Sequence, residues 1–393
     1  MTRSTPTRRR PDNKNLRIVF GIIAFCLFAF GLFCSGLTGL MLFSNGPGIF
    51  IMATMLATFT AVPYGLLLVW LDHNEREPIP LLIAGFLWGA LIATAFSGIV
   101  NTLVGEIAMA VTGSPSASDF MSASISAPFI EELTKGMALV VLVGMFYKEF
   151  DNVLDGVIYG AIVGLGFAWF ENIMYYCDAA SMGGIEGMIK NFWARGVVSA
   201  SGGSHAAYSG LVGLGFGLTR MLRKGFARWM LIPLFLGLAM FAHFAWNTFV
   251  EHFIFIFDQP TDASVYFVSL PIAVLVLQLP FSGLLSLVVI FSWRHEYKII
   301  RQHLADEPAE IITDAERNTL VPAWRRSVAD LKRFFTKGPG LWLRHRRRIR
   351  HQVDLAFVKW HLANDAGVDW EADDDLDVYE LREKIRVLRG SLS

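Results

Sequence analysis

The stretch SAPFIEELTKGMALVVLVGMF (residues 126–146) places Glu131, Glu132 and Lys135 inside a run that is otherwise almost wholly apolar. About 20 consecutive apolar residues are enough for a helix to cross the hydrocarbon core of a bilayer. An ionisable side chain there costs several kcal/mol unless it is paired or hydrated. We therefore expect these three residues to line a polar site on a membrane helix.

The composition of the whole chain agrees with a membrane protein. Of the 393 residues, 54% are hydrophobic and 17% are charged, and the mean hydropathy is +0.46. Such a chain is too apolar for a soluble protein and too patterned for a disordered one. The formal net charge is zero, so we expect no nucleic-acid partner. The three cysteines do not make a disulfide framework and are interpreted as packing residues.

Hydropathy predicts an all-α, polytopic membrane bundle of about eight transmembrane helices. Each predicted span has the length that a bilayer requires. The third and the last are long enough to tilt or kink. The expected spans are 18–43, 48–71, 81–111, 124–147, 156–177, 197–219, 229–256 and 265–293.

The distribution of Lys and Arg predicts the orientation of these spans. The N-terminal arm holds six such residues, whereas the predicted outer loops hold only Lys190 and Arg195. Positive residues concentrate on the cytoplasmic side of membrane proteins. We therefore expect both termini in the cytoplasm and a multi-pass protein of the cell membrane.

Three regions follow from this layout. Residues 1–17 form a basic cytoplasmic arm, 18–293 a transmembrane domain and 294–393 a partly helical cytoplasmic tail. The tail contains GPG at 338–340, the basic run RHRRRIR at 344–350 and the acidic patch EADDDLD at 371–377. The basic run is suited to anionic lipid headgroups, although a solvated regulatory tail explains it equally well.

Polar residues recur in four consecutive predicted spans. Residues four apart share one face of a helix, as Glu131 and Lys135 do, and as His243 and Asn247 do. The helices alternate in direction, yet their polar groups fall at one depth, in the outer half of the membrane. We therefore expect a single shared cavity. Its candidate residues are Glu131, Glu132, Lys135, Glu171, Asn172, His205, His243 and Asn247.

This set of groups suits general acid–base hydrolysis of an amide. One carboxylate can take a proton from water and a protonated one can return it, while imidazole and amide groups can donate to the oxyanion. No Ser or Cys lies in an evident nucleophile motif. We therefore favour activated water over a covalent intermediate.

The same residues also allow interpretations other than a hydrolase that needs no cofactor. The two histidines and three glutamates are possible zinc ligands, but the chain lacks the H-E-x-x-H motif, so we expect no metal. Buried carboxylates and histidines also form proton relays in transporters, but no repeat of polar placement supports that class. Each group also has a purely structural interpretation. Glu131, Glu132 and Lys135 suit an ion pair between helices, Glu171 and His205 suit contacts with headgroups, and His243 with Asn247 suits an interhelical hydrogen bond.

Four ordered motifs resemble the PrsW family of membrane-embedded proteases, which is related to the CAAX prenyl endopeptidases. They are EELTK at 131–135, FAWFEN at 167–172, SHAAYSG around His205 and HFAWN at 243–247. The loop LDHNEREP at 71–78 also resembles an acidic loop of that family. The resemblance covers about residues 50–260 and does not reach the tail.

The resemblance implies a glutamate-dependent intramembrane peptidase. By position, Glu131 and Glu132 would activate water, His205 would be an essential partner, and Glu171, His243 and Asn247 would complete the site. The substrate implied is a single-pass membrane protein, such as an anti-sigma factor, cut on its outer side. Spacing alone does not decide which glutamate is the base.

Overall fold

The computed structural model describes residues 14–146, 150, 152–221, 225–254, 261–320, 323–364 and 374–390. Within these ranges every regular element is helical, as the sequence predicted. The chain divides into two compact units, and each is described by itself. Among the described residues, one unit holds 14–72 and 77–289, and the other holds 73–76 and those from 290 to 390.

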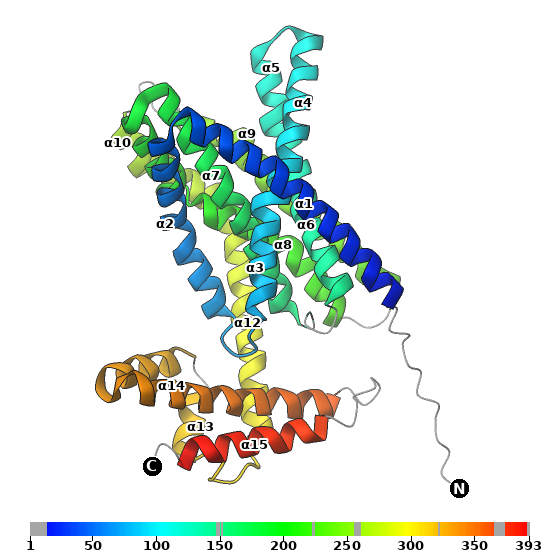
Figure 1. The fold of residues 1–393 in the computed structure, drawn as a ribbon, viewed down its shortest axis with the longest axis vertical. Coiled ribbons are helices and arrows are strands. Elements are labelled where there is room, and N and C mark those ends of the chain that lie inside the picture. The colour runs from blue at the N-terminus through cyan, green and yellow to red at the C-terminus, as the bar shows by residue number, and fades with distance from the viewer. Residues whose placement is uncertain are drawn as a thin grey trace. The chain divides into compact units, whose positions relative to one another are not determined.

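The larger unit is a helical bundle (Figure 1). In chain order its elements are α1 (Lys14–Asn45), α2 (Pro47–Leu71), α3 (Ile79–Leu87), η1 (Trp88–Ala93), α4 (Thr94–Thr112), α5 (Pro115–Asp119), η2 (Phe120–Ser126), α6 (Ala127–Met145), α7 (Val153–Asn191), η4 (Phe192–Val198), α8 (Ser201–Met221), η5 (Phe226–Met230), α9 (Leu231–Ile254), α10 (Asp262–Ser264), η6 (Val265–Ser269), α11 (Leu270–Ala273), η7 (Val274–Gln278) and α12 (Leu279–His303), the last of which continues into the smaller unit.

Six helical stretches in the described residues are long and apolar enough to cross a membrane: Ile18–Ser44, Pro47–Leu71, Ile79–Thr112, Val153–Val198, Arg228–Ile254 and Asp262–His303. The predicted count of about eight is therefore not confirmed. The other two predicted spans do form helices, α6 and α8. α6 carries three ionisable residues and α8 is rich in glycine and serine, which lowers the apolarity of both.

Helix α7 is the buried centre of the bundle and packs most extensively on α8. A Cβ atom added at Gly160 would lie 2.2 Å from the carbonyl oxygen of Ser209, and one at Gly164 would lie 2.1 Å from that of His205. Only glycine permits so close a backbone approach. Gly156, Gly160 and Gly164, which are four residues apart on α7, therefore lie at its interface with α8.

Helix α7 is bent near its end. Gly184 has φ 63°, a left-handed conformation that favours glycine, and it interrupts the helical backbone together with Gly183. The chain then continues through η4 to the start of α8. This bend matters because η4 carries Arg195.

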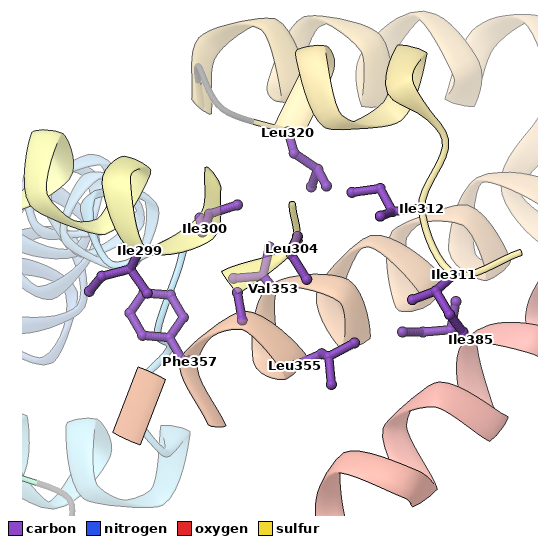
Figure 2. Close-up of a cluster of buried hydrophobic side chains, with 11 residues drawn as sticks. Ile299, Ile300, Leu304, Ile311, Ile312, Leu320, Val353, Leu355, Phe357 and Ile385 are labelled. Atoms are coloured by element: carbon purple, nitrogen blue, oxygen red, sulfur yellow. The ribbon is translucent and has the colours of Figure 1, made fainter. Parts of the chain in front are cut away.

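The smaller unit has its own hydrophobic core. It contains the end of α12, α13 (Asp314–Leu320), α14 (Ala323–Asn364) and α15 (Asp374–Gly390). Figure 2 shows the core, to which α12, α14 and α15 all contribute side chains. The buried residues are Ile299, Ile300, Leu304, Ile311, Ile312, Leu320, Val353, Leu355, Ala356, Phe357 and Ile385.

The loop after α2 belongs partly to this smaller unit. Asn74 donates to Glu296 at 2.5 Å and accepts from Arg326 at 2.7 Å, and all three residues are buried. A polar loop of this kind would ordinarily be solvated. Here its central residue is an internal hydrogen-bonding group of the tail unit.

Candidate active site

Glu132 is the most fully bonded carboxylate of the site. It is 0% exposed. One oxygen accepts from Lys135 Nζ at 2.9 Å and from His243 Nδ1 at 3.0 Å, and the other accepts from Ser209 Oγ at 3.2 Å. These donors come from α6, α8 and α9, so Glu132 joins three helices. With both oxygens occupied, it has little capacity left for a water molecule.

Glu131 lies on the same helix but is held more loosely. Its nearest donors are Asn101 Nδ2 at 3.4 Å and Lys135 Nζ at 3.5 Å, and His243 Nε2 lies 3.9 Å away. All three distances are longer than those around Glu132. Glu131 is therefore the carboxylate with room to accept a further hydrogen bond.

Lys135 supplies the positive charge between the two glutamates. Its side chain is buried, and Nζ lies 3.1 Å from His205 Nδ1 and 3.8 Å from the centre of the Phe167 ring. An ammonium removed from water requires such compensation, from carboxylates, a ring nitrogen and an aromatic face. The i, i+4 spacing predicted the Glu131 contact, and the structure adds the Glu132 contact.

Glu171 is the third carboxylate and has its own cation. It accepts from His205 Nε2 at 3.0 Å and is paired with Arg195 of η4. Arg195 Nε also donates to Asn172 Oδ1 at 2.8 Å, and Ser201 Oγ donates to the same oxygen at 3.0 Å. Asn172 therefore holds Arg195 in position, and Arg195 balances the charge of Glu171.

These contacts fix the histidine tautomers. Because carboxylates only accept, His243 carries its proton on Nδ1, toward Glu132, and His205 carries its proton on Nε2, toward Glu171. The remaining ring nitrogens are His243 Nε2 and His205 Nδ1. The two rings lie 5.1 Å apart between centroids, and Tyr208 is stacked on His243.

The structure thus brings seven of the eight predicted residues into one connected network. Asn247 is the exception, because its amide donates to the backbone oxygen of Ala123 at 2.8 Å and links α9 to η2. No described hydrogen bond joins it to the glutamates or histidines. Its predicted part in oxyanion binding stays a prediction.

Sequence reasoning missed Ser201 and three residues that contact the glutamates directly, Ser209, Asn101 and Arg195. Ser209 follows His205 by four residues, so helical spacing was sufficient to find it. Asn101 lies within a predicted span, and it accepts from Ser126 at 2.7 Å and reaches Glu131. Arg195 was counted only as a charge in an outer loop. Arg195 could have been found from the sequence, because a carboxylate inside the membrane, such as Glu171, requires a nearby positive charge.

Three of these groups are placed to hold a metal ion. Glu131, His205 and His243 each offer one ligand atom, and the three atoms lie within 4.8 Å of one another. Carboxylates hold the other nitrogen of each ring, as is usual for metal-binding histidines. The donor set therefore fits a zinc-like ion, although Lys135 Nζ lies 3.5 Å from a Glu131 oxygen and 3.1 Å from His205 Nδ1 in this structure.

The fold and the site together define a class. A helical membrane bundle encloses carboxylates, imidazoles and an ammonium on α6, α7, α8 and α9, with the chemistry of a hydrolase rather than of a structural scaffold. Residues 77–277, just over half of the chain, match the model of a family described as PrsW family intramembrane metalloprotease. The chain belongs to this family and is a multi-pass membrane peptidase.

Individual relatives agree. The Protease PrsW of Geobacillus kaustophilus (strain HTA426) is 32% identical over 169 residues, which are 42% of this chain and 67% of that protein. Protease PrsW of Bacillus subtilis (strain 168) is 31% identical over 104 residues, 26% of this chain and 44% of the relative. The Halalkalibacterium halodurans protein of the same name is 26% identical over 214 residues, which are 52% of this chain and 89% of that protein.

No solved structure matches the chain. All residues of the network lie inside the region that the family model matches, whereas the tail lies outside it. The family assignment supports a peptidase and does not favour the transporter alternative. The family description names a metalloprotease, while the sequence argued for hydrolysis without a metal.

Proposed function

We propose that this protein hydrolyses a peptide bond of a membrane-protein substrate with water activated by Glu131. The supporting observation is the asymmetry of the two adjacent glutamates. Glu132 has both oxygens occupied at 2.9–3.2 Å, whereas the donors nearest Glu131 lie at 3.4 and 3.5 Å. A general base must be able to accept a hydrogen bond from its water.

The other groups have distinct roles in this proposal. Glu131 takes a proton from water, the water oxygen bonds to the scissile carbon, and the Lys135 ammonium stabilises the oxyanion. The C–N bond then breaks as Glu131 returns the proton to the leaving amine. His205 and His243, protonated toward Glu171 and Glu132, position the network rather than donate to the oxyanion.

A metal-dependent reaction is the second candidate, and the 4.8 Å grouping of Glu131, His205 and His243 favours it. A bound zinc ion would polarise the carbonyl and activate water. Glu132 and Glu171 would orient the two histidines. Because Lys135 Nζ contacts Glu131 and His205, two of these three residues, the ammonium and the metal would be alternative occupants.

The experiment uses a tagged single-pass substrate co-expressed in membranes. Glu131→Gln and His205→Ala are expected to stop cleavage, and Glu186→Gln is the control because Glu186 pairs with Lys190 in an exposed ion pair. Equal cleavage by Glu131→Gln and the parent would refute the proposal. Loss of cleavage with a chelator, restored by zinc, would favour the second candidate instead.

We also propose that the chain crosses the membrane about eight times, with α6 and α8 included and both termini cytoplasmic. The Lys and Arg distribution supports this orientation. The site then lies in the outer half of the membrane, which suits a single-pass substrate such as an anti-sigma factor. Reporter fusions after Thr112 and after His303 should report outer and cytoplasmic locations, respectively.

A further inference from the structure

Helix α14 of the tail is bent into two segments. Gly338 has φ 79°, which interrupts the helical backbone, and Pro339 follows it. A Cβ at Gly338 would meet nothing within 4 Å, so conformation rather than space explains the glycine. The second segment carries Val353, Leu355 and Phe357 of the tail core (Figure 2).

The first segment presents an uncovered apolar face. Val328, Leu331 and Phe335 are 57%, 60% and 76% exposed. Their spacing of three and four residues places them on one side of the helix. Arg326, on the other side, is buried. A large aromatic side chain so exposed, beside two aliphatic ones, indicates a surface that meets an apolar partner.

The same stretch is strongly basic. Residues 323–350 contain ten Lys and Arg and one acidic residue, Asp330. Four exposed members, Lys332, Lys337, Arg347 and Arg350, have no ion-pair partner among the described residues.

Three other basic residues of the tail unit are neutralised. Arg382 and Lys359 pair with Glu307 at 2.7 and 2.8 Å, and Arg389 pairs with Glu316 at 2.6 Å. Exposed cations without an ion-pair partner among the described residues lie on both segments of α14, and Arg294, Lys298 and Arg301 of α12 are also unpaired there. Of these cations, Lys332 lies on the exposed apolar side of the first segment.

We propose that α14 docks on anionic phospholipid headgroups through the exposed Val328, Leu331, Lys332 and Phe335 of its first segment and the exposed Arg347 and Arg350 of its second segment. Apolar side chains flanked by unpaired cations are typical of helices that lie in the membrane interface. Each cation near an anionic surface adds to the attraction, and salt screens that attraction. A nucleic acid would use the cations but leave the apolar side chains uncovered. The tail follows α12 directly, which keeps its effective concentration at a membrane high.

The test uses the full-length protein in vesicles. In a background with Cys26, Cys34 and Cys177 replaced by serine, Val328→Cys and Val387→Cys receive the same environment-sensitive dye. Val387 is the matched control because it is also an exposed valine of the tail unit, at 69%. In phosphatidylglycerol vesicles we expect iodide quenching at position 328 to be at least threefold weaker than at 387, and lipid-borne quenchers to reach only 328.

The protection at 328 should disappear in phosphatidylcholine vesicles, at high salt and in the Lys332→Glu, Arg347→Glu, Arg350→Glu variant. Equal iodide quenching at 328 and 387 in anionic vesicles would overturn the proposal. So would protection that persists in phosphatidylcholine without access of the lipid quencher, because it would show that protein covers the face instead.

Discussion

At the scale of single residues, the two neighbouring glutamates of α6 differ because of what surrounds them. Helical spacing predicted that they point about 100° apart, but their partners come from distant parts of the chain. Ser209 and His243 approach Glu132, and Asn101 approaches Glu131. Such long-range contacts are decided by packing, so the sequence predicted the pair but not the division of roles.

Glu132→Gln should destabilise the protein more than Glu131→Gln. Removing the charge of Glu132 leaves the buried ammonium of Lys135 with a single carboxylate partner, Glu131 at 3.5 Å. Losing one partner of a buried ion pair costs on the order of 3 kcal/mol. Thermal unfolding of the detergent-solubilised variants measures this. Equal melting temperatures for the two variants would contradict the structural role of Glu132.

Lys135→Met separates the two candidate mechanisms. Without the ammonium, the proposed oxyanion donor is lost, and cleavage should fall by about 100-fold. If a metal is the true occupant, removing the competing charge should instead raise metal affinity. Metal content of the purified variant, measured beside its cleavage rate, distinguishes these results.

His345 of the tail should make that unit sensitive to mild acid. Burial and the charges of Arg333 and Arg348 lower the pKa of His345 to about 4, and Arg348 donates to its Nδ1 at 3.3 Å. The unfolded chain, with a histidine pKa near 6.5, binds the proton first. Stability from this group is therefore complete above pH 6.5 and declines as the pH falls toward 4.

Hydrogen exchange of α14 in the full-length protein at pH 7 and pH 5 tests this, with His345→Gln as comparison. The parent should lose protection at pH 5 and the variant should change less. Burial raises the pKa of Asp330, so its contribution to stability increases as the pH falls. This contribution is present in both the parent and the variant. The same loss of protection in parent and variant would contradict the role of His345.

At the scale of elements, the close approach of α7 and α8 positions the site. Glycines four residues apart form a stripe of small residues on each helix, which permits this tight packing. The π-helical segments η1, η2 and η4 were not predicted, since nothing in their composition distinguishes them from α-helix. Arg195 lies in one of them, after the bend at Gly184, which explains why its partnership with Glu171 was missed.

Gly164→Ala should therefore impair catalysis through α8. The new methyl group would lie 2.1 Å from the carbonyl oxygen of His205, so the helices must separate and move the imidazole. A displacement of about 1 Å can cost 100-fold in rate. Gly237→Ala on α9 is the control, because nothing lies within 4 Å of its Cβ. Cleavage rates similar for both variants would show that the interface tolerates the change.

At the scale of the whole molecule, the chain combines a family domain with an additional unit. The match to the PrsW family covers residues 77–277, and the network lies entirely within it. The second compact unit includes the loop 73–76 and the described residues from Ile290 onward, while the predicted boundary of a cytoplasmic tail at residue 294 stays a prediction. Local hydropathy could not reveal that Asn74 is buried beside Glu296 and Arg326, because that contact joins residues more than 200 positions apart.

The most direct test is the cleavage rate of purified protein in proteoliposomes containing a single-pass substrate. Glu131→Gln preserves size but removes the base, so its rate should be about 100- to 10,000-fold below that of the parent. Glu186→Gln should stay within twofold. A Glu131→Gln protein that is folded and cuts at the parental rate would contradict the claim that this carboxylate activates water.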